Sequence, residues 1–163
     1  MLPIELASIN RGLKFGQKLY EDGAYTGYLN ADDKNEGAGI TIFFDGQRDF
    51  GEYHCDKVNG ICKNVIVEEQ DYWGQWKDHN REGYGTQNLF SVGLTYIGQF
   101  KNDKKHGYGH TNLLDGSYYW GQYKKGNRNG YGFYKWTNGD EYDGEWKEGY
   151  RTGVGIYKFA ATG

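Results

Sequence analysis

The sequence contains little proline, little cysteine and no long hydrophobic segment. Proline occurs once in 163 residues, which excludes a proline-rich linker and, despite 27 glycines, a collagen-like chain. The longest apolar stretch runs only from Ile40 to Phe44, whereas a membrane-spanning helix needs about 18 apolar residues or more. Two cysteines, Cys55 and Cys62, are too few for a disulfide framework, so we expect a reducing, cytoplasmic environment.

Charge and terminal signals are also sparse. The formal net charge is −3, so no global basic field would attract nucleic acid, and we predict no nucleic-acid partner. The first residues, Met1 to Glu5, lack a basic segment followed by an apolar one, and neither end carries a lipidation motif. We therefore expect neither a secretion signal nor a lipid anchor.

Glycine and aromatic residues are abundant instead, and they recur together. Aromatics make up 18% of the chain, with 16 tyrosines, more than a disordered polar chain carries. An aromatic-x-Gly-x-aromatic unit repeats at intervals of 23 or 24 residues. This regular period indicates a tandem repeat protein. The anchor glycines of the six units are Gly27, Gly51, Gly74, Gly98, Gly121 and Gly144.

Each unit has the pattern of a β-hairpin. The unit that starts at Tyr72 reads Tyr-Trp-Gly-Gln-Trp, continues into the pair Gly83 and Gly85, and reaches a turn glycine at Gly93. Segments of about five to seven residues, rich in aromatic and β-branched side chains, have strand length. The sequence therefore predicts an all-β fold of tandem hairpins, forming one elongated, twisted antiparallel sheet or trough.

Strand geometry explains why glycines and rings occur together. Alternate residues share a face, so Tyr72, Gly74 and Trp76 lie on one side of their strand. The missing glycine side chain leaves room for a ring from the neighbouring strand to lie across the backbone. A column of large apolar residues in the second strands also predicts a hydrophobic ladder. Its members are Phe43, Ile66, Leu89, Leu113, Trp136 and Phe159.

The recurring positions, Tyr-x-Gly-x-Trp followed by Gly-x-Gly and a turn glycine, resemble the MORN repeat (membrane occupation and recognition nexus). The resemblance spans Tyr25 to Phe159. The second unit departs most, with Asp49 at the tyrosine position, Cys62 at the second pair glycine and Glu69 at the turn glycine. The resemblance implies a non-catalytic interaction module of the kind found in cytoskeletal machines, including radial-spoke heads of cilia and flagella and apicomplexan scaffolds.

The repeat array divides the chain into two regions. Residues 1–15 are expected to form an N-terminal cap or tail, either a short helix, which apolar residues at helical spacing would form, or equally a disordered tail. Residues 16–163 are expected to form the array, with an opening half-unit at 16–24 and units starting near residues 25, 49, 72, 96, 119 and 142. A bare last strand would pair with another chain, as in a homodimer, or continue into a longer protein.

No residue pattern indicates catalysis. Acidic residues scatter through the predicted loops and turns, and the Gly-x-Gly pairs lack the Lys-Ser/Thr of a phosphate-binding loop. His54, Cys55 and Cys62 match no strong zinc-ligand spacing. We therefore predict a protein that is not an enzyme and has no catalytic residue, no cofactor and no metal.

Two sets of side chains are candidates for partner binding. Most ladder aromatics are structural, but a single-layer sheet leaves some rings on an open groove, where tyrosine and tryptophan are favoured anchors. The predicted groove aromatics are Tyr72, Trp76, Tyr96, Phe100, Tyr119, Tyr123, Tyr142 and Trp146. A second row, on the opposite face, comprises Tyr84, Tyr108 and Tyr131. A modest basic rim for anionic lipid or an acidic partner comprises Lys101, Lys104, Lys105, Lys124 and Lys125.

These features favour an interaction scaffold over an enzyme. The leading hypothesis is a structural component of a cytoskeletal or ciliary assembly, resembling the axonemal radial spoke, located in the cytoplasm at the cytoskeleton or cilium. Its partners would be axonemal or other cytoskeletal proteins. The alternative is an accessory or membrane-phosphoinositide-binding module of a larger protein, such as a lipid kinase or a methyltransferase.

Overall fold

The computed structural model describes residues 12–161, and this part of the chain is all β. It contains thirteen strands and one 3₁₀ turn, and the chain divides into two compact units, unit 1 up to Asn80 and unit 2 from Arg81. Between residues 12 and 161, no helix has the length and apolar character needed to span a membrane. The predicted N-terminal cap or tail lies mostly outside the described residues.

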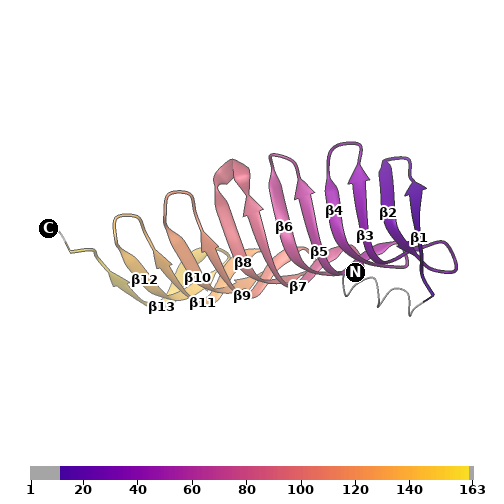
Figure 1. Ribbon diagram of the computed structural model, residues 1–163. Helices are drawn as coiled ribbons and strands as arrows, with labels where there is room; N and C mark the ends of the chain where they lie inside the picture. The colour runs from indigo at the N-terminus through magenta and orange to yellow at the C-terminus, as the bar shows by residue number, and fades with distance from the viewer. Residues whose placement is uncertain (1–11, 162–163) are drawn as a thin grey trace. The chain divides into compact units, whose positions relative to one another are not determined.

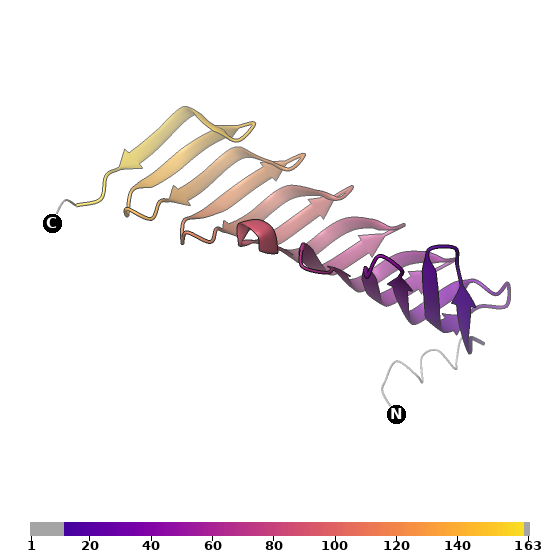
Figure 2. The ribbon, with the colours of Figure 1, turned by 90° about the horizontal axis from the view of Figure 1, so that it is seen from above.

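Within each unit the strands follow one another as antiparallel hairpins (Figure 1), and Figure 2 shows these hairpins side by side. Unit 1 holds β1 (Lys14–Leu19), β2 (Gly23–Leu29), β3 (Asn35–Phe43), β4 (Arg48–His54), β5 (Lys57–Ile66) and β6 (Gln70–Lys77). The next strand, β7 (Asn80–Leu89), begins at the boundary. Unit 2 continues with the 3₁₀ turn η1 (Phe90–Val92), β8 (Leu94–Lys101), β9 (Lys104–Asn112), β10 (Tyr118–Lys124), β11 (Asn127–Lys135), β12 (Glu141–Lys147) and β13 (Tyr150–Lys158). The predicted all-β fold of tandem hairpins is confirmed.

Paired glycines and a tyrosine ring form the repeating core. Gly98 of β8 lies opposite Gly109 of β9, and a Cβ on Gly109 would overlap the ring of Tyr96. The Tyr96 hydroxyl donates a hydrogen bond to the backbone oxygen of Gln99 at 2.8 Å. The ring therefore comes from the strand of the anchor glycine and reaches across to the next strand, whereas we expected a ring from the neighbouring strand. The same bond recurs at Tyr25, Tyr119 and Tyr142.

A β-bulge follows the glycine pair in the hairpins that begin with β2, β8, β10 and β12, and it bends each of them. The register shifts between Gly121 and Tyr123, and Gly130 on the partner strand has a φ of 97°, a conformation that favours glycine. Gln122 provides a partner for the backbone at the bulge, since its Oε1 accepts a hydrogen bond from the Tyr131 N–H at 2.7 Å. Bulges increase local twist and bending, in agreement with the curved strands of Figure 1.

The repeat that begins near residue 49 departs from this pattern, as its sequence predicts. Asp49 stands at the tyrosine position, and Asn64 Nδ2 donates a hydrogen bond to its Oδ1 at 2.6 Å. Cys62 lies opposite Gly51, at the position where the regular repeats have a second glycine. The Cys62 side chain is buried. The strand pairing continues on both sides, so the departure changes the core locally and leaves the sheet intact.

The predicted apolar column is less buried than expected. Each member lies at or just after the end of the second strand of its hairpin, next to a turn. Solvent therefore reaches one side of each of these side chains. Phe159 is exposed, and the half-buried members are Phe43, Ile66, Leu89, Leu113 and Trp136.

Candidate interaction surfaces

Each unit presents two faces. The ladder face carries the packed tyrosines, such as Tyr96, and the outer face carries the residues that alternate with them, such as Ile97. Alternation along a strand puts successive side chains on opposite sides of a sheet. The two faces therefore differ in burial and in chemistry.

The predicted groove aromatics form the packed core of the ladder face. All of them except Trp76 are buried, and Trp76 is partly buried. The rings of Tyr119 and Trp146 meet edge to face with their centroids 5.3 Å apart, a favoured geometry for aromatic pairs. In this arrangement the rings stabilise the sheet, and their use as partner anchors stays a prediction. The buried members are Tyr72, Tyr96, Phe100, Tyr119, Tyr123, Tyr142 and Trp146.

A row of cations covers the rings of unit 2. Lys105 Nζ lies 4.8 Å from the Tyr96 ring centroid, and the Arg128 guanidinium lies 4.3 Å from the Trp146 ring centroid, within the range of cation–π attraction. Sequence analysis missed this row, although its spacing of 23 or 24 residues follows the repeat period. The four cations are Arg81, Lys105, Arg128 and Arg151.

Lys105 consequently differs from the other lysines of the predicted basic rim. Its side chain is half-buried, and burial, with a smaller contribution from Arg81, lowers its pKa to about 8. The other four lysines are exposed at the ends of hairpins. Any basic rim is therefore limited to Lys101, Lys104, Lys124 and Lys125.

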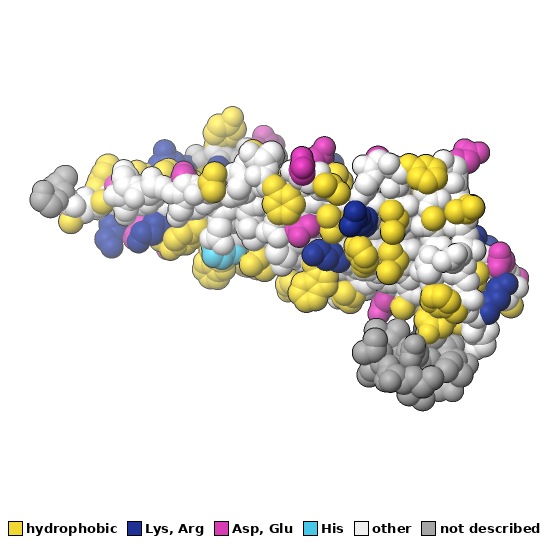
Figure 3. Space-filling model, turned by 45° about the horizontal axis from the view of Figure 1, so that its top comes forward, with side chains coloured by type: hydrophobic (Ala, Val, Ile, Leu, Met, Phe, Trp, Pro, Cys, Tyr) yellow, Lys and Arg dark blue, Asp and Glu magenta, His cyan; other side chains and the backbone are white. Residues whose placement is uncertain are grey.

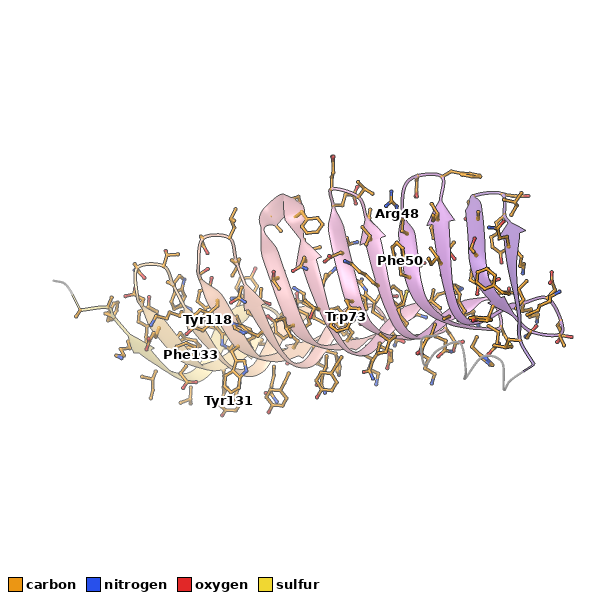
Figure 4. The ribbon with its side chains drawn as sticks, viewed as in Figure 1. Arg48, Phe50, Trp73, Tyr118, Tyr131 and Phe133 are labelled. Atoms are coloured by element: carbon orange, nitrogen blue, oxygen red, sulfur yellow. The ribbon has the colours of Figure 1, made fainter. Side chains whose placement is uncertain are left out.

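The outer face of unit 2 exposes apolar and aromatic side chains in one row. His110 pairs with both Ile97 and Trp120, and Trp120 pairs with Phe133. Ile97 and Trp120 are exposed. Tyr118 joins this row, with its ring centroid 5.6 Å from His110 and 5.9 Å from Phe133. Figure 4 shows Tyr118 and Phe133 close together on neighbouring strands.

The second predicted tyrosine row also lies on the outer face of unit 2. Tyr84, Tyr108 and Tyr131 are 64%, 60% and 63% exposed, and Figure 4 shows Tyr131 beneath the bent ribbon. Gln122 Nε2 donates a hydrogen bond to the Tyr108 hydroxyl at 3.2 Å, and the Tyr131 hydroxyl donates one to Glu145 Oε1 at 3.0 Å. These bonds orient the hydroxyls and leave the ring faces accessible.

The outer face of unit 1 carries fewer aromatic residues and more charge. Phe50 lies opposite Lys63, and Lys63 lies opposite Trp73. Trp73 is exposed, and Phe50 is partly so. Figure 4 shows Phe50 and Arg48 on the same strand, and Figure 3 shows hydrophobic side chains at the surface with basic and acidic groups among them.

Glu36, His54 and Cys55 form the cluster nearest to a metal site among the described residues, with one donor atom of each within 4.8 Å of the others. His54 Nδ1 lies 2.9 Å from Glu36 Oε1, and the Cys55 N–H donates to Glu36 Oε2 at 3.2 Å. Glu82 accepts a hydrogen bond from the Asn102 N–H in the same way, at 2.9 Å. This contact between a glutamate and a hairpin turn therefore forms without a histidine or a cysteine. The glutamate is therefore explained as a cap of the hairpin turn. Cys62 is buried and outside this cluster.

Comparison with known families gives a match over much of the second half of the chain. The MORN repeat family model matches residues 72–87, 96–111, 119–141 and 142–161. These segments cover most of β6 to β13, with the glycine pair Gly98 and Gly109 and the tyrosines Tyr96, Tyr119 and Tyr142, whereas Tyr25 lies outside them. No curated protein matches the chain.

Proposed function

Because residues 72–161 carry four MORN repeats, we propose that this protein is a non-catalytic scaffold that binds other proteins through the outer face of unit 2. MORN repeats generally mediate protein or membrane interactions. The repeats supply a rigid sheet on which a partner can dock.

The exposed aromatic surface of unit 2 is the observation that carries this proposal. Trp120 and Ile97 stand exposed beside Tyr118 and Phe133, and the tyrosine row runs along the same face. Contiguous exposed apolar surface of this kind marks interaction sites, and tyrosine and tryptophan are enriched in their centres. The carboxylates of Asp143 and Glu145 lie on the same face, so it suits a protein surface better than an anionic membrane.

The proposed assembly is cytoskeletal or ciliary and similar to the axonemal radial spoke. This part of the proposal depends on the family resemblance alone. We propose the cytoplasm, at the cytoskeleton or cilium, as its location and axonemal or cytoskeletal proteins as its partners. Recovery of partners from another compartment would contradict it.

An affinity pull-down from native cell extract tests the docking face. Trp120→Ala should lose the specific partners, because it removes the largest exposed ring from the proposed surface. Leu114→Ala is the matched control, since Leu114 is also an exposed hydrophobic residue of unit 2 but lies in a turn. Circular dichroism would first establish that both variants are folded. Equal capture by the wild type and Trp120→Ala would contradict the proposal.

A membrane role is the alternative that the four exposed lysines favour. Binding to liposomes that contain phosphoinositide should then fall with rising salt, because exposed charges are screened. It should also be lost when Lys101, Lys104, Lys124 and Lys125 are changed to glutamine. Such a result, combined with no loss for Trp120→Ala, would favour an accessory lipid-binding module of a larger protein.

A further inference from the structure

The departure of one repeat from the pattern opens a cavity on the ladder face of unit 1. In register, Thr41 lies opposite Asp49, and Asp49 lies opposite Asn64. A regular repeat would place a tyrosine at residue 49, and its ring would cover two glycines. Asp49 is shorter than tyrosine, and the Cys62 side chain fills only part of the space that a ring would occupy. A cavity of about 460 Å³ is left, open to solvent on one side.

The cavity is acidic. Asp22, Asp49 and Asp56 line it, and among the described residues no lysine or arginine does. Lys18 Nζ lies 3.1 Å from Asp56 Oδ1, so Asp56 already has a cation. His79 is the remaining basic group of the lining.

Asp49 is the buried carboxylate of this cavity and lacks a cation. It is only 7% exposed, and its hydrogen-bond partner in the described structure is Asn64. Burial raises the pKa of Asp49, with opposing contributions from Asn64 and His79. His79 Nδ1 accepts a hydrogen bond from the Val58 N–H at 3.4 Å, so this nitrogen already has a partner. A buried carboxylate with one neutral partner is costly unless a donor completes its shell.

Aromatic rings form part of the wall, together with polar side chains such as Thr41 and Asn64. Tyr53 is buried, and its hydroxyl lies 2.7 Å from Thr41 Oγ1. Trp76 Nε1 donates a hydrogen bond to the Cys62 backbone oxygen at 3.2 Å. Tyr20 lines the cavity from the turn after β1. Because the polar atoms of Tyr53 and Trp76 are engaged elsewhere, these two residues offer mainly apolar ring surface to a ligand.

We propose that this cavity binds a primary alkylammonium group, whose N–H donates to Asp49 and whose alkyl chain lies against Tyr53 and Trp76. A buried carboxylate in a cavity that is partly lined by aromatic rings matches a cation carried on an apolar stem. An anion would meet three carboxylates. The proposal is independent of the protein-docking face of unit 2.

Two sources carry this chemistry, a free diamine or polyamine and the lysine side chain of a peptide. Titration with cadaverine, spermidine and a short peptide with one central lysine and blocked ends separates them. Tighter binding of the peptide would identify a partner's lysine as the ligand, and tighter binding of spermidine a free polyamine. Both results support the shared chemistry.

Nuclear magnetic resonance of the full chain provides a direct test. The indole N–H of Trp76, assigned with Trp76→Phe, should shift saturably with each amine. Asp49→Asn keeps the shape and removes the charge, and it should weaken binding roughly tenfold to a hundredfold, as expected for loss of a charge-assisted hydrogen bond. Asp143→Asn, an exposed carboxylate of unit 2, is the matched control and should bind like the wild type.

A second variant guards against a folding artefact. Asp49→Tyr combined with Cys62→Gly restores the regular unit, so the ring should fill the cavity and abolish binding in a folded protein. The proposal is overturned if no amine gives a saturable shift, or if Asp49→Asn binds as tightly as the wild type. It is also overturned if tetramethylammonium, which has no N–H to donate, binds as well as cadaverine.

Discussion

Lys105 shows how a single residue departs from the environment that its sequence suggests. It stands in a lysine-rich segment, yet its ammonium nitrogen lies over the Tyr96 ring. The ring face stabilises the ammonium group, but burial opposes the charge more strongly and lowers the pKa to about 8. An unfolded lysine has a pKa near 10.5. Folding therefore favours the neutral amine.

The pH dependence of stability follows from this difference. Between about pH 8 and pH 10.5 the unfolded chain holds the Lys105 proton while the folded chain releases it, so stability rises with pH in this window. Urea denaturation across the window should give a rising free energy of unfolding relative to Lys105→Gln, in which this titration is absent. Lys104→Gln, at an exposed neighbour, should follow the wild type. If the difference in the free energy of unfolding between the wild type and Lys105→Gln stayed constant across this pH window, the expected burial of the Lys105 amine would be contradicted.

The sequence predicted the regular residues well and the irregular ones poorly. Glycine pairs and tyrosines could be assigned because their roles follow from spacing and strand alternation. The stacking of Arg128 on Trp146 and the burial of Lys105 depend on how neighbouring hairpins pack, which spacing does not report. The cavity beside Asp49 likewise depends on side-chain packing, because Cys62 fills only part of the space that a tyrosine ring would occupy.

At the level of the hairpin, the residue after the anchor glycine holds the bulge. Gln122 accepts the Tyr131 N–H and donates to the Tyr108 hydroxyl. Elsewhere in the chain glutamate takes this position, as Glu52 does when its Oε2 accepts the Ile61 N–H at 3.3 Å. The bulge therefore needs a side-chain oxygen that accepts the backbone N–H, and either a neutral glutamine or a charged glutamate can supply it.

Removing that acceptor should destabilise unit 2. Gln122→Met keeps the length of the side chain but leaves the Tyr131 N–H without its partner, so we expect a loss of about 1 kcal/mol, the usual net value of a hydrogen bond. Gln122→Glu keeps the acceptor and should cost clearly less. Urea denaturation of the two variants provides the measurement. Equal losses would show that packing of the amide, rather than the bond, stabilises the bulge.

The hairpin was the largest element that could be predicted. Its strands can be longer than the five to seven residues expected, since β9, β11 and β13 have nine residues each and run through the Gly-x-Gly pairs. Turn glycines and aromatic segments mark where strands begin and end, and β8 to β13 follow these marks. Which face would be buried followed from alternation, but which side chains stay exposed did not. The buried groove aromatics and the exposed Trp120 differ because the rings of the ladder face pack on one another, whereas the outer face has no second layer in the described structure.

At the scale of the whole molecule, pairing is local. In each unit a strand pairs with its neighbours in the sequence, so no long loop closure is needed and stability should behave as a sum of repeats and their interfaces. Damage to one repeat should then spread only to adjacent ones. The core of β8 and β9 offers a place to test this, because Gly109 has no positive φ and the atoms nearest to a Cβ at this position belong to the Tyr96 ring.

Gly109→Ala should therefore destabilise unit 2 by about 2–3 kcal/mol, since overpacking a close contact costs this much. In hydrogen exchange followed by mass spectrometry, we expect faster exchange in β8 to β10 and unchanged exchange in β2 to β4. Gly16→Ala is the matched control, because its new methyl group meets only the flexible end of Leu29, with Cδ1 at 2.8 Å, and should change little. Faster exchange throughout both units would contradict a repeat-by-repeat description, because it would mean that the chain opens as one cooperative body.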